Sequence, residues 1–239
     1  MKWLTKPKVP EPISFRRNIK AMCGRFTQGF SETHYAMTLD SGWTPAPLHL
    51  KPTWNVAPSR QALVLHDDDS GHVAELLHWG FLPSWADPAA AKPINARVET
   101  AATKPYFRHA WKAGRCLIPA DGWYEWKATA GGKQPYFIHR ADDEPLFMAG
   151  LYETNPQVKV TSFAILTTEA KGDLREIHDR EPLVLSPEAA TEWIRPDLPA
   201  ADVAAISQLA PPSGNFSWHA VSARVNNTKN DGAELMLKT

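Results

Sequence analysis

The sequence predicts a single α+β domain with a mainly antiparallel, barrel-like β-sheet flanked by short helices. The first observation is that 21 prolines recur through the 239 residues instead of forming one tract, which indicates many loops and short elements and argues against a helical bundle. The second is a series of short apolar runs bounded by turn residues, a pattern typical of strands. With 43% hydrophobic and 22% charged residues, the composition is that of a globular protein.

The strands are predicted from these apolar runs. The runs at 62–66 and 73–79 flank an Asp-Asp-Asp-Ser-Gly turn, which predicts a β-hairpin. Further apolar or aromatic runs predict strands at 115–119, 122–126, 135–140, 146–152 and 163–168. No internal repeat is visible, so the strands belong to one sheet system and not to an array of copies.

The helices are predicted from capping residues and short periodic segments. Ser31 is placed to cap a helix over 32–39, with Gly42 just beyond its end. Ser186 is placed to cap another over 187–195, where a proline takes the first helical position. The remaining helices are expected at 97–103, 106–113 and 202–209.

Residues 1–21 differ in composition from the rest of the chain. They carry six basic side chains against one acidic one, contain three prolines and show no sustained period, which predicts a disordered or loosely attached extension. The apolar central region of a signal peptide is missing. Two interpretations stay open: a genuine extension, or codons upstream of a true start at Met22. Residues 22–239 are then the folded domain.

The formal net charge of zero hides this division, because the remainder has 20 basic and 25 acidic residues and a net charge of about −5. Overall charge therefore gives no support to nucleic-acid binding, and a DNA site must be a local groove of Arg, Asn and aromatic side chains. The two cysteines, Cys23 and Cys116, are too few for a disulfide framework and fit a reducing compartment. No apolar run approaches the roughly 20 residues of a membrane-spanning helix, so we predict a cytoplasmic protein without membrane contact.

Five motifs follow one another in an order that is specific as a set. They are Met-Cys-Gly-Arg-Phe (22–26), Trp-Asn-Val-Ala-Pro (54–58), Ile-Asn-Ala-Arg-Val-Glu-Thr (94–100), Ala-Asp-Gly-Trp-Tyr-Glu-Trp (120–126) and Ile-His-Asp-Arg-Glu-Pro-Leu-Val-Leu (177–185). The series resembles the SOS response associated peptidase (SRAP) family, from Met22 to the Gly-Ala-Glu-Leu segment at 232–235. The resemblance implies a monomer that binds single-stranded DNA, crosslinks covalently to abasic sites and shields them near the replication machinery, on damaged DNA in the nucleoid.

The chemistry of an N-terminal cysteine supports this function. It carries a thiol and a free α-amine, whose ordinary pKa of about 7.7–8.0 leaves a useful neutral fraction at pH 7. The amine forms a Schiff base with the aldehyde of a ring-opened abasic site, and the thiolate closes a thiazolidine ring on the imine carbon. Cys23 can react in this way only as the first residue, because the nitrogen of an internal cysteine is an amide. We therefore expect translation from Met22 with removal of that methionine, in preference to cleavage of a basic leader.

Three further residues complete the catalytic set that the resemblance implies. Glu125 lies between Tyr124 and Trp126, which could desolvate its carboxyl group and raise its pKa into the range useful for proton transfer. Strand alternation alone would instead turn Glu125 outward. The resemblance makes Glu125 an acid/base in sugar-ring opening and imine formation, and makes His178 a proton donor in the same steps, for which an imidazole is suited. Asn95 belongs to both the catalytic and the DNA-binding set.

The expected DNA-binding residues are Arg25, Asn95, Arg97, Trp85 and Thr167. Asn95 and Arg97 would point to the same side if the segment is extended, offering an amide and a guanidinium to sugar or phosphate oxygens. Arg25 could hold the phosphate beside the lesion. Trp85 is a candidate to stack on a base, and ordinary core packing is its alternative. Thr167 enters this set through the resemblance alone.

Metal ligands and cofactor motifs are not apparent: the His and Cys positions lack close paired spacing, and no Gly-rich phosphate loop precedes a helix. We predict no metal and no cofactor. Two other functions stay open. Cys23, His178 and Glu125 also suit a cysteine peptidase, acting on other chains or on its own leader. A binder of modified or damaged DNA without chemistry is the third possibility, with Cys23 then a small buried hydrophobe, as expected for Cys116.

Overall fold

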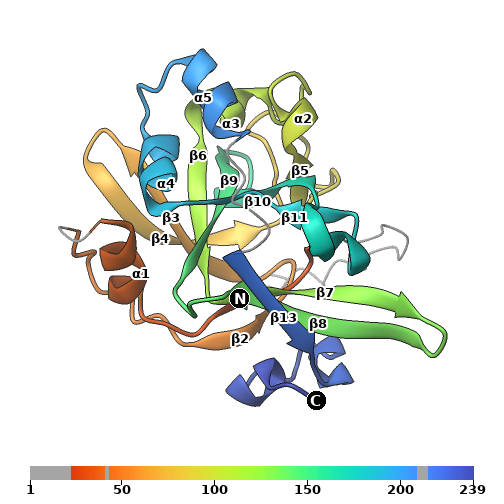
Figure 1. Cartoon of the computed structure of the whole chain (residues 1–239). Helices are drawn as coiled ribbons and strands as arrows, with labels where there is room; N and C mark the ends of the chain where they lie inside the picture. Colours follow the sequence, from red (N-terminus) through yellow and green to blue (C-terminus); the bar gives the residue numbers. More distant parts are fainter. Residues whose placement is uncertain (1–22, 41–42, 209–214) are drawn as a thin grey trace, which may run out of the picture.

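The computed structural model describes residues 23–40, 43–208 and 215–239 (Figure 1). The predicted extension at 1–21 lies outside the described residues, as do Gly42 and the last residue of the helix predicted at 202–209. The described chain combines antiparallel sheets with a few short helices, which confirms the predicted α+β class.

Five strands close into a barrel. Strand β10 pairs with β9 on one edge and runs parallel to β4 on the other, and the antiparallel pairs β4–β3, β3–β6 and β6–β9 complete the ring. The barrel-like sheet predicted from the sequence is therefore confirmed. The strands are β3 (Gln61–Asp68), β4 (Gly71–Trp79), β6 (Arg115–Ala120), β9 (Leu146–Asn155) and β10 (Val160–Glu169).

Three short strands extend the barrel at the edges of β9 and β10. β5 (Asn95–Arg97) runs parallel to β10, β11 (Arg180–Pro182) is antiparallel to it, and β12 (Val184–Leu185) is antiparallel to β9. The sequences of β5 and β11 contain no apolar run and β12 has only two residues, which is why the sequence did not reveal them. Tertiary pairing with a long barrel strand makes these segments extended.

A second sheet lies against the barrel and is antiparallel in every pairing (Figure 1). The chain passes from β6 directly into β7, so the predicted strand pair at 115–119 and 122–126 joins the two sheets. In spatial order the strands are β13 (Phe216–Ala220), β8 (Gly132–Arg140), β7 (Gly122–Thr129), β1 (Phe26–Gln28) and β2 (Thr53–Val56).

Barrel residues alternate between two buried clusters. On β9, Phe147 and Ala149 pack with residues of the helices, whereas Leu146 and Met148 pack with residues of the second sheet. Because successive side chains of a strand point to opposite faces, a strand covered on both sides needs a continuous apolar run. This explains why the strand predictions from such runs were correct.

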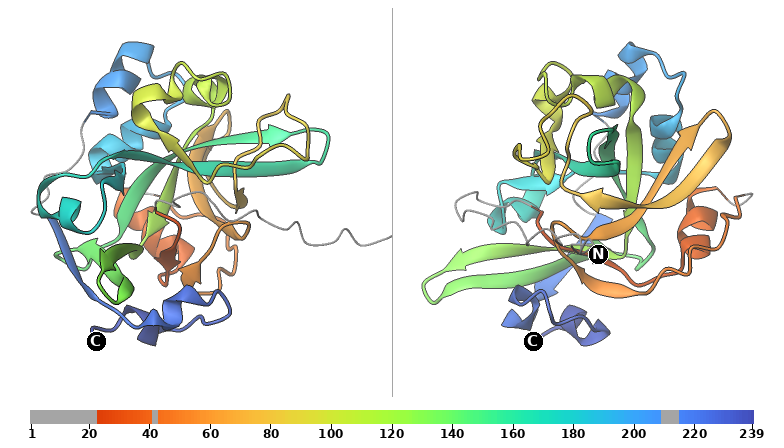
Figure 2. Two further views of the ribbon diagram at one scale, coloured as in Figure 1. Left: turned by 90° about the vertical axis from the view of Figure 1, so that its right-hand side faces the viewer. Right: turned by 180° about the vertical axis from the view of Figure 1, so that it is seen from behind.

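The helices that follow residue 97 gather around one end of the barrel, whereas the helix over 32–39 lies apart from that end (Figures 1 and 2). Both predicted caps are present: the side chain of Ser31 accepts from the His34 amide at 3.1 Å, and Ser186 accepts from the Ala189 amide at 3.3 Å. The helix predicted at 97–103 is wrong at its start, because Arg97 pairs with β10 as a strand residue. The helices are α1 (Glu32–Leu39), α2 (Val98–Ala101), α3 (Arg108–Ala113), α4 (Pro187–Ile194) and α5 (Ala200–Ile206).

Short 3₁₀ helices follow the last barrel strand and the second sheet: η1 (Gly172–Glu176), η3 (Ala223–Asn226) and η4 (Ala233–Met236). The last two lie near the C-terminus, against the second sheet (Figure 1). Among the described residues, no helix combines the length and apolar character needed to cross a bilayer.

Candidate functional site

Cys23 lies beside Glu125, although 102 positions separate them in the chain. The backbone nitrogen of Cys23 donates to Oε1 of Glu125 at 2.6 Å. Antiparallel pairing of β1 with β7 brings the two together, because Phe26 pairs with Trp123. Cys23 has a φ of 43°, in the left-handed region that non-glycine residues rarely adopt. A strained backbone therefore holds this nitrogen against a carboxyl group.

The carboxyl group of Glu125 is buried, with the residue 2% exposed. Burial raises its pKa to about 8, and hydrogen bonds from the Cys23 and Trp126 amides only partly oppose this. The outward orientation expected from strand alternation is wrong. Trp123 packs toward the barrel and Tyr124 packs under Val221 and the C-terminal helices, so β7 is covered on both faces.

The thiol of Cys23 is also buried, with the residue 1% exposed in the cluster between the two sheets. Burial, and secondly the neighbouring Glu125 carboxylate, raise the pKa of this thiol well above its ordinary value. The thiol is therefore neutral at pH 7 and needs a base before it can act as a nucleophile. Cys116 is buried on β6 and burial raises its pKa as well, in agreement with a structural role.

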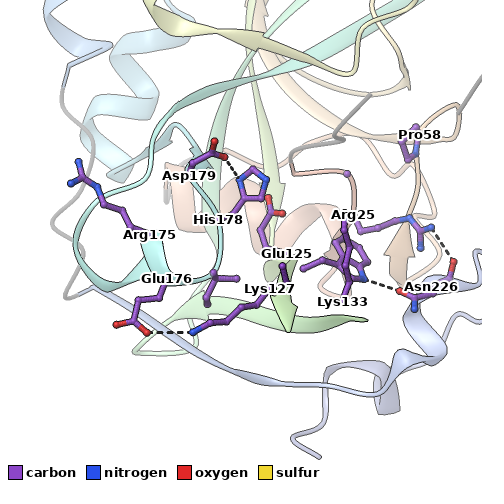
Figure 3. Close-up of a pocket in the computed structure, with 14 residues that line it drawn as sticks. Arg25, Pro58, Glu125, Lys127, Lys133, Arg175, Glu176, His178, Asp179 and Asn226 are labelled. Carbon is purple, nitrogen blue, oxygen red and sulfur yellow. Dashed lines mark hydrogen bonds and ion pairs between the residues drawn. The ribbon is translucent and has the colours of Figure 1, made fainter. Parts of the chain in front are cut away.

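A cavity of about 1090 Å³ opens in front of Glu125 (Figure 3). Glu125, His178 and Arg25 line it, and in this view Glu125 lies between His178 and Arg25. Lys127, Lys133 and Arg175 bring positive charge to its wall, and Lys127 lies 3.4 Å from a carboxylate oxygen of Glu176. The two neighbours of the Cys23 nitrogen that line this cavity are Glu125, to which it donates, and the adjoining Gly24.

His178 is held in the loop between η1 and β11. Its amide donates to Leu174 O at 3.1 Å, and its Nδ1 accepts from the Arg180 amide at 3.1 Å and lies 3.0 Å from Oδ1 of Asp179. With Nδ1 engaged by these neighbours, the ring is fixed in orientation on the cavity wall. His178 and Glu125 thus present two titratable groups to one cavity.

Arg25 is bound to the C-terminal segment. Its guanidinium donates to Oδ1 of Asn55 and to Val225 O, each at 2.7 Å, and to Asn226 O at 3.3 Å. Burial lowers the pKa of Arg25, although an arginine stays charged at any physiological pH. The sequence could not indicate these contacts, because η3 lies 200 positions away. The same guanidinium borders the cavity.

Asn95, Arg97 and Thr167 line a second cavity of about 550 Å³. Parallel pairing of β5 with β10 places Arg97 opposite Thr167. Asn95 and Arg97 belong to strand β5, so the segment has the extended backbone under which we expect their side chains to point to the same side. Lys104 and Tyr106 also line this cavity. The residues expected from the sequence therefore do not all line one cavity: Arg25, Glu125 and His178 line the first, whereas Asn95, Arg97 and Thr167 line the second.

Arg180 and Glu99 connect the two cavities, and the sequence reasoning assigned them no role. The guanidinium of Arg180 binds both carboxylate oxygens of Glu99, at 2.5 and 2.9 Å, and donates to Thr167 O at 2.5 Å. Its amide also donates to His178. Arg180 stands within the Ile-His-Asp-Arg motif, and its partners lie on segments that only the fold brings close.

Trp85 stands on the protein surface, 60% exposed, in the loop between β4 and β5. The alternative of core packing is therefore wrong. Its ring meets the ring of Tyr106 edge-on, with centroids 5.7 Å apart. A third cavity, of about 350 Å³, lies between Trp85 and the residues Ser84, Pro105, Arg108 and His109.

Comparison with known proteins decides the family. Residues 22–228 match the family described as SOS response associated peptidase (SRAP). The chain belongs to the SRAP family. This confirms the resemblance drawn from the five motifs, and the SRAP match includes every residue that lines the first two cavities.

Several relatives of this SRAP chain have been named for their activity. It is 42% identical over 226 residues to the abasic site processing protein YedK of Escherichia coli, covering 90% of this chain and 99% of YedK. It is 34% identical over 223 residues to the abasic site processing protein YoaM of Bacillus subtilis, covering 90% of this chain and 97% of YoaM. It is 31% identical over 224 residues to the abasic site processing protein HMCES of Gallus gallus, covering 78% of this chain and 66% of HMCES.

Solved structures share the SRAP fold. A phage-related protein from Bordetella bronchiseptica superposes with a TM-score of 0.71 at 35% identity, covering 83% of this chain and 94% of that one. A protein from Bacteroides thetaiotaomicron superposes with a TM-score of 0.74 at 21% identity, covering 87% and 98%, which supports the fold alone.

Proposed function

We propose that this protein processes abasic sites in DNA, and that Cys23, as the first residue of a mature chain, forms a thiazolidine crosslink with the ring-opened aldehyde in single-stranded DNA. Relatives over nearly the whole chain are named abasic site processing proteins. The observation that carries the chemistry is the 2.6 Å contact between the Cys23 nitrogen and the Glu125 carboxyl group.

Proton transfer is the first requirement of this reaction. In a chain that starts at Cys23, the nitrogen becomes an α-amine with an ordinary pKa of about 7.7–8.0. In the uncleaved chain burial raises the pKa of Glu125 to about 8, and the ammonium group of a mature chain lowers it from there, so this buried carboxyl group can take up and return a proton near neutral pH. Glu125 therefore serves as the base that frees the amine for attack.

Bond formation then proceeds in two steps. The amine nitrogen attacks the aldehyde carbon, and the resulting carbinolamine loses water when Glu125, with His178 on the same cavity wall, returns a proton to the departing oxygen. The Cys23 sulfur next attacks the imine carbon, and the thiol proton moves through Glu125 to the nitrogen. One carbon–nitrogen and one carbon–sulfur bond form, and one water leaves.

Access to the site favours an unpaired strand. The sugar aldehyde must reach a carboxyl group that is 2% exposed, at the wall of a cavity, and a nucleotide stacked within a duplex cannot do so. Arg97 and Lys104 in the second cavity, and Lys127 in the first, offer cations to the phosphates on either side. These local cations would act against the net negative charge of the domain.

The test is incubation of a chain initiated at Met22 with a single-stranded oligonucleotide that contains one abasic site, followed by denaturing electrophoresis. A covalent species should form, should be absent with Cys23→Ala, and should be much reduced when the strand is paired. If the chain is shown by mass to begin at Cys23 and no shifted species forms, the proposal is refuted.

A second candidate function is cleavage of the chain before Cys23, and one observation favours it. The nitrogen bound by Glu125 belongs to the Met22–Cys23 amide, and Cys23 has strained backbone. In this reaction the Cys23 sulfur attacks the Met22 carbonyl carbon, Glu125 protonates the leaving nitrogen, and water hydrolyses the thioester. The products are a Met22 carboxylate and a Cys23 with free thiol and amine.

Intact mass measurement of the full-length chain over time tests this candidate. Loss of residues 1–22 should occur in the wild type and be slowed strongly in Glu125→Gln, which keeps the side-chain volume but cannot donate the carboxyl proton. Equal rates in the two purified proteins would leave self-cleavage without support and point to another route of maturation.

A further inference from the structure

The loop that carries Trp85 is held from behind by the β9–β10 hairpin. Figure 2 shows this hairpin extending from the barrel, with the segment between β4 and β5 running beside it. Glu153 and Asn155 on β9 and Ser162 on β10 face that segment, and all three side chains are buried. Buried polar side chains are costly unless they are hydrogen-bonded, so their partners indicate their purpose.

Asn155 holds both ends of the turn around Trp85. Its Nδ2 donates to Pro83 O at 2.8 Å and to Ala86 O at 2.9 Å, while its Oδ1 accepts from the Gln157 amide at 3.0 Å. The Ala86 amide closes the same turn by donating to Pro83 O at 3.1 Å. Trp85 therefore lies within a turn whose two end carbonyl groups, those of Pro83 and Ala86, are both bound by the side-chain amide of Asn155.

The other two hairpin side chains bind the approach to this turn. Oε1 of Glu153 accepts from the Ser84 amide at 2.9 Å and lies 3.4 Å from Nδ1 of His109, and Oγ of Ser162 accepts from the Leu82 amide at 2.9 Å. Glu153 and Ser162 are cross-strand partners in the β9–β10 ladder. The backbone on each side of Trp85 is therefore fixed to a rigid element, while its indole stays 60% exposed.

We propose that Asn155 and Glu153 are positioning residues that hold Trp85 as a stacking platform for an unpaired base of single-stranded DNA. The inference rests on the proposed function, which supplies the single strand. An exposed indole that is fixed before binding loses little conformational freedom when a base stacks on it. The cavity beside Trp85 leaves room for a base, and Arg108 at its border offers a cation to the adjoining phosphate.

Asn155→Asp isolates the donor function of Asn155. The variant keeps the volume and the oxygen that binds the Gln157 amide, but it turns an acceptor toward the Pro83 and Ala86 carbonyl groups. Affinity for a fluorescein-labelled oligothymidylate without any abasic site, measured by anisotropy, should fall by about 3- to 30-fold. Trp85→Ala should weaken binding by about 5- to 150-fold, the share expected for one stacked base.

The double variant separates positioning from general destabilisation. In the Trp85→Ala background, Asn155→Asp should cause no further loss of affinity, because the platform it positions is already gone. A loss of equal size in both backgrounds, or wild-type affinity for Asn155→Asp, overturns the inference. The assay needs no crosslink, so wild-type protein that binds this oligonucleotide but forms no adduct with a strand containing an abasic site refutes the proposed function and not this inference.

Glu153 provides a second, matched pair of variants, which keeps the inference testable should Asn155→Asp fail to fold. Glu153→Gln retains the acceptor for the Ser84 amide and should bind oligothymidylate like the wild type. Glu153→Ala removes it and should bind about 3- to 10-fold more weakly. Equal affinities of these two variants would count against a positioning role.

Discussion

Replacing Glu125 by Gln should flatten the dependence of stability on pH. Glu125→Gln keeps the volume of the side chain and the acceptor for the Cys23 amide, but the new group cannot ionise. Both proteins should carry Cys23→Ala, which removes the buried thiol and keeps the nitrogen an amide. The difference in stability between the two proteins then reflects the ionisation of the Glu125 carboxyl group alone.

The magnitude follows from the pKa of Glu125, which burial raises from an ordinary 4.5 to about 8. Between these values the unfolded chain has lost the proton and the folded chain keeps it, so the free energy of unfolding falls as pH rises. At about 1.4 kcal/mol per pKa unit, this group contributes a loss of about 4 kcal/mol between pH 5 and pH 9. The contribution is fully present below pH 4.5 and is lost above pH 8.

Urea unfolding at pH 5, 7 and 9 measures the effect, as the difference between the two proteins at each pH. Other titrating groups cancel in this difference, because they are common to both. The stability of Glu125→Gln relative to the parent should therefore rise by about 4 kcal/mol from pH 5 to pH 9. A difference that does not change with pH would refute the raised pKa of Glu125 in the uncleaved chain.

Further predictions concern the mature amine, the second cavity and the link between the cavities. In a chain starting at Cys23, the ammonium group should lower the pKa of Glu125, so carbon-13 NMR titration of its carboxyl group should give a value below that of the uncleaved chain. Arg97→Ala should weaken binding of intact single-stranded DNA and reduce the slope of its salt dependence by about one, as measured by anisotropy at several salt concentrations. An unchanged slope would remove Arg97 from the phosphate contacts. Glu99→Ala leaves the Arg180 guanidinium without its carboxylate and should cost about 1–3 kcal/mol in urea unfolding, with lower crosslink yield. Wild-type stability would mean that the pair does not hold the two cavities together.

Local patterns in the sequence were sufficient for the long elements. Continuous apolar runs identified the barrel strands, since a strand buried on both faces needs such a run, and Ser31 and Ser186 identified two helix starts through their caps. The short strands β5 and β11 carry no such pattern. They are extended only because β10 pairs with them, and this pairing also explains why Arg97 is not helical.

The sequence by itself determined the family, the barrel-like α+β class and the residues worth examining, because ordered motifs and hydrophobic runs are local properties of a chain. The tertiary structure decided how those residues meet. It put the Cys23 nitrogen against Glu125 and buried a carboxyl group that strand alternation would have exposed. Burial, pKa values and side-chain contacts depend on which distant segments pack together. The pairing of β1 with β7 is one such long-range contact, and the packing of the C-terminal segment over β7 is another. No local sequence pattern predicts either of them.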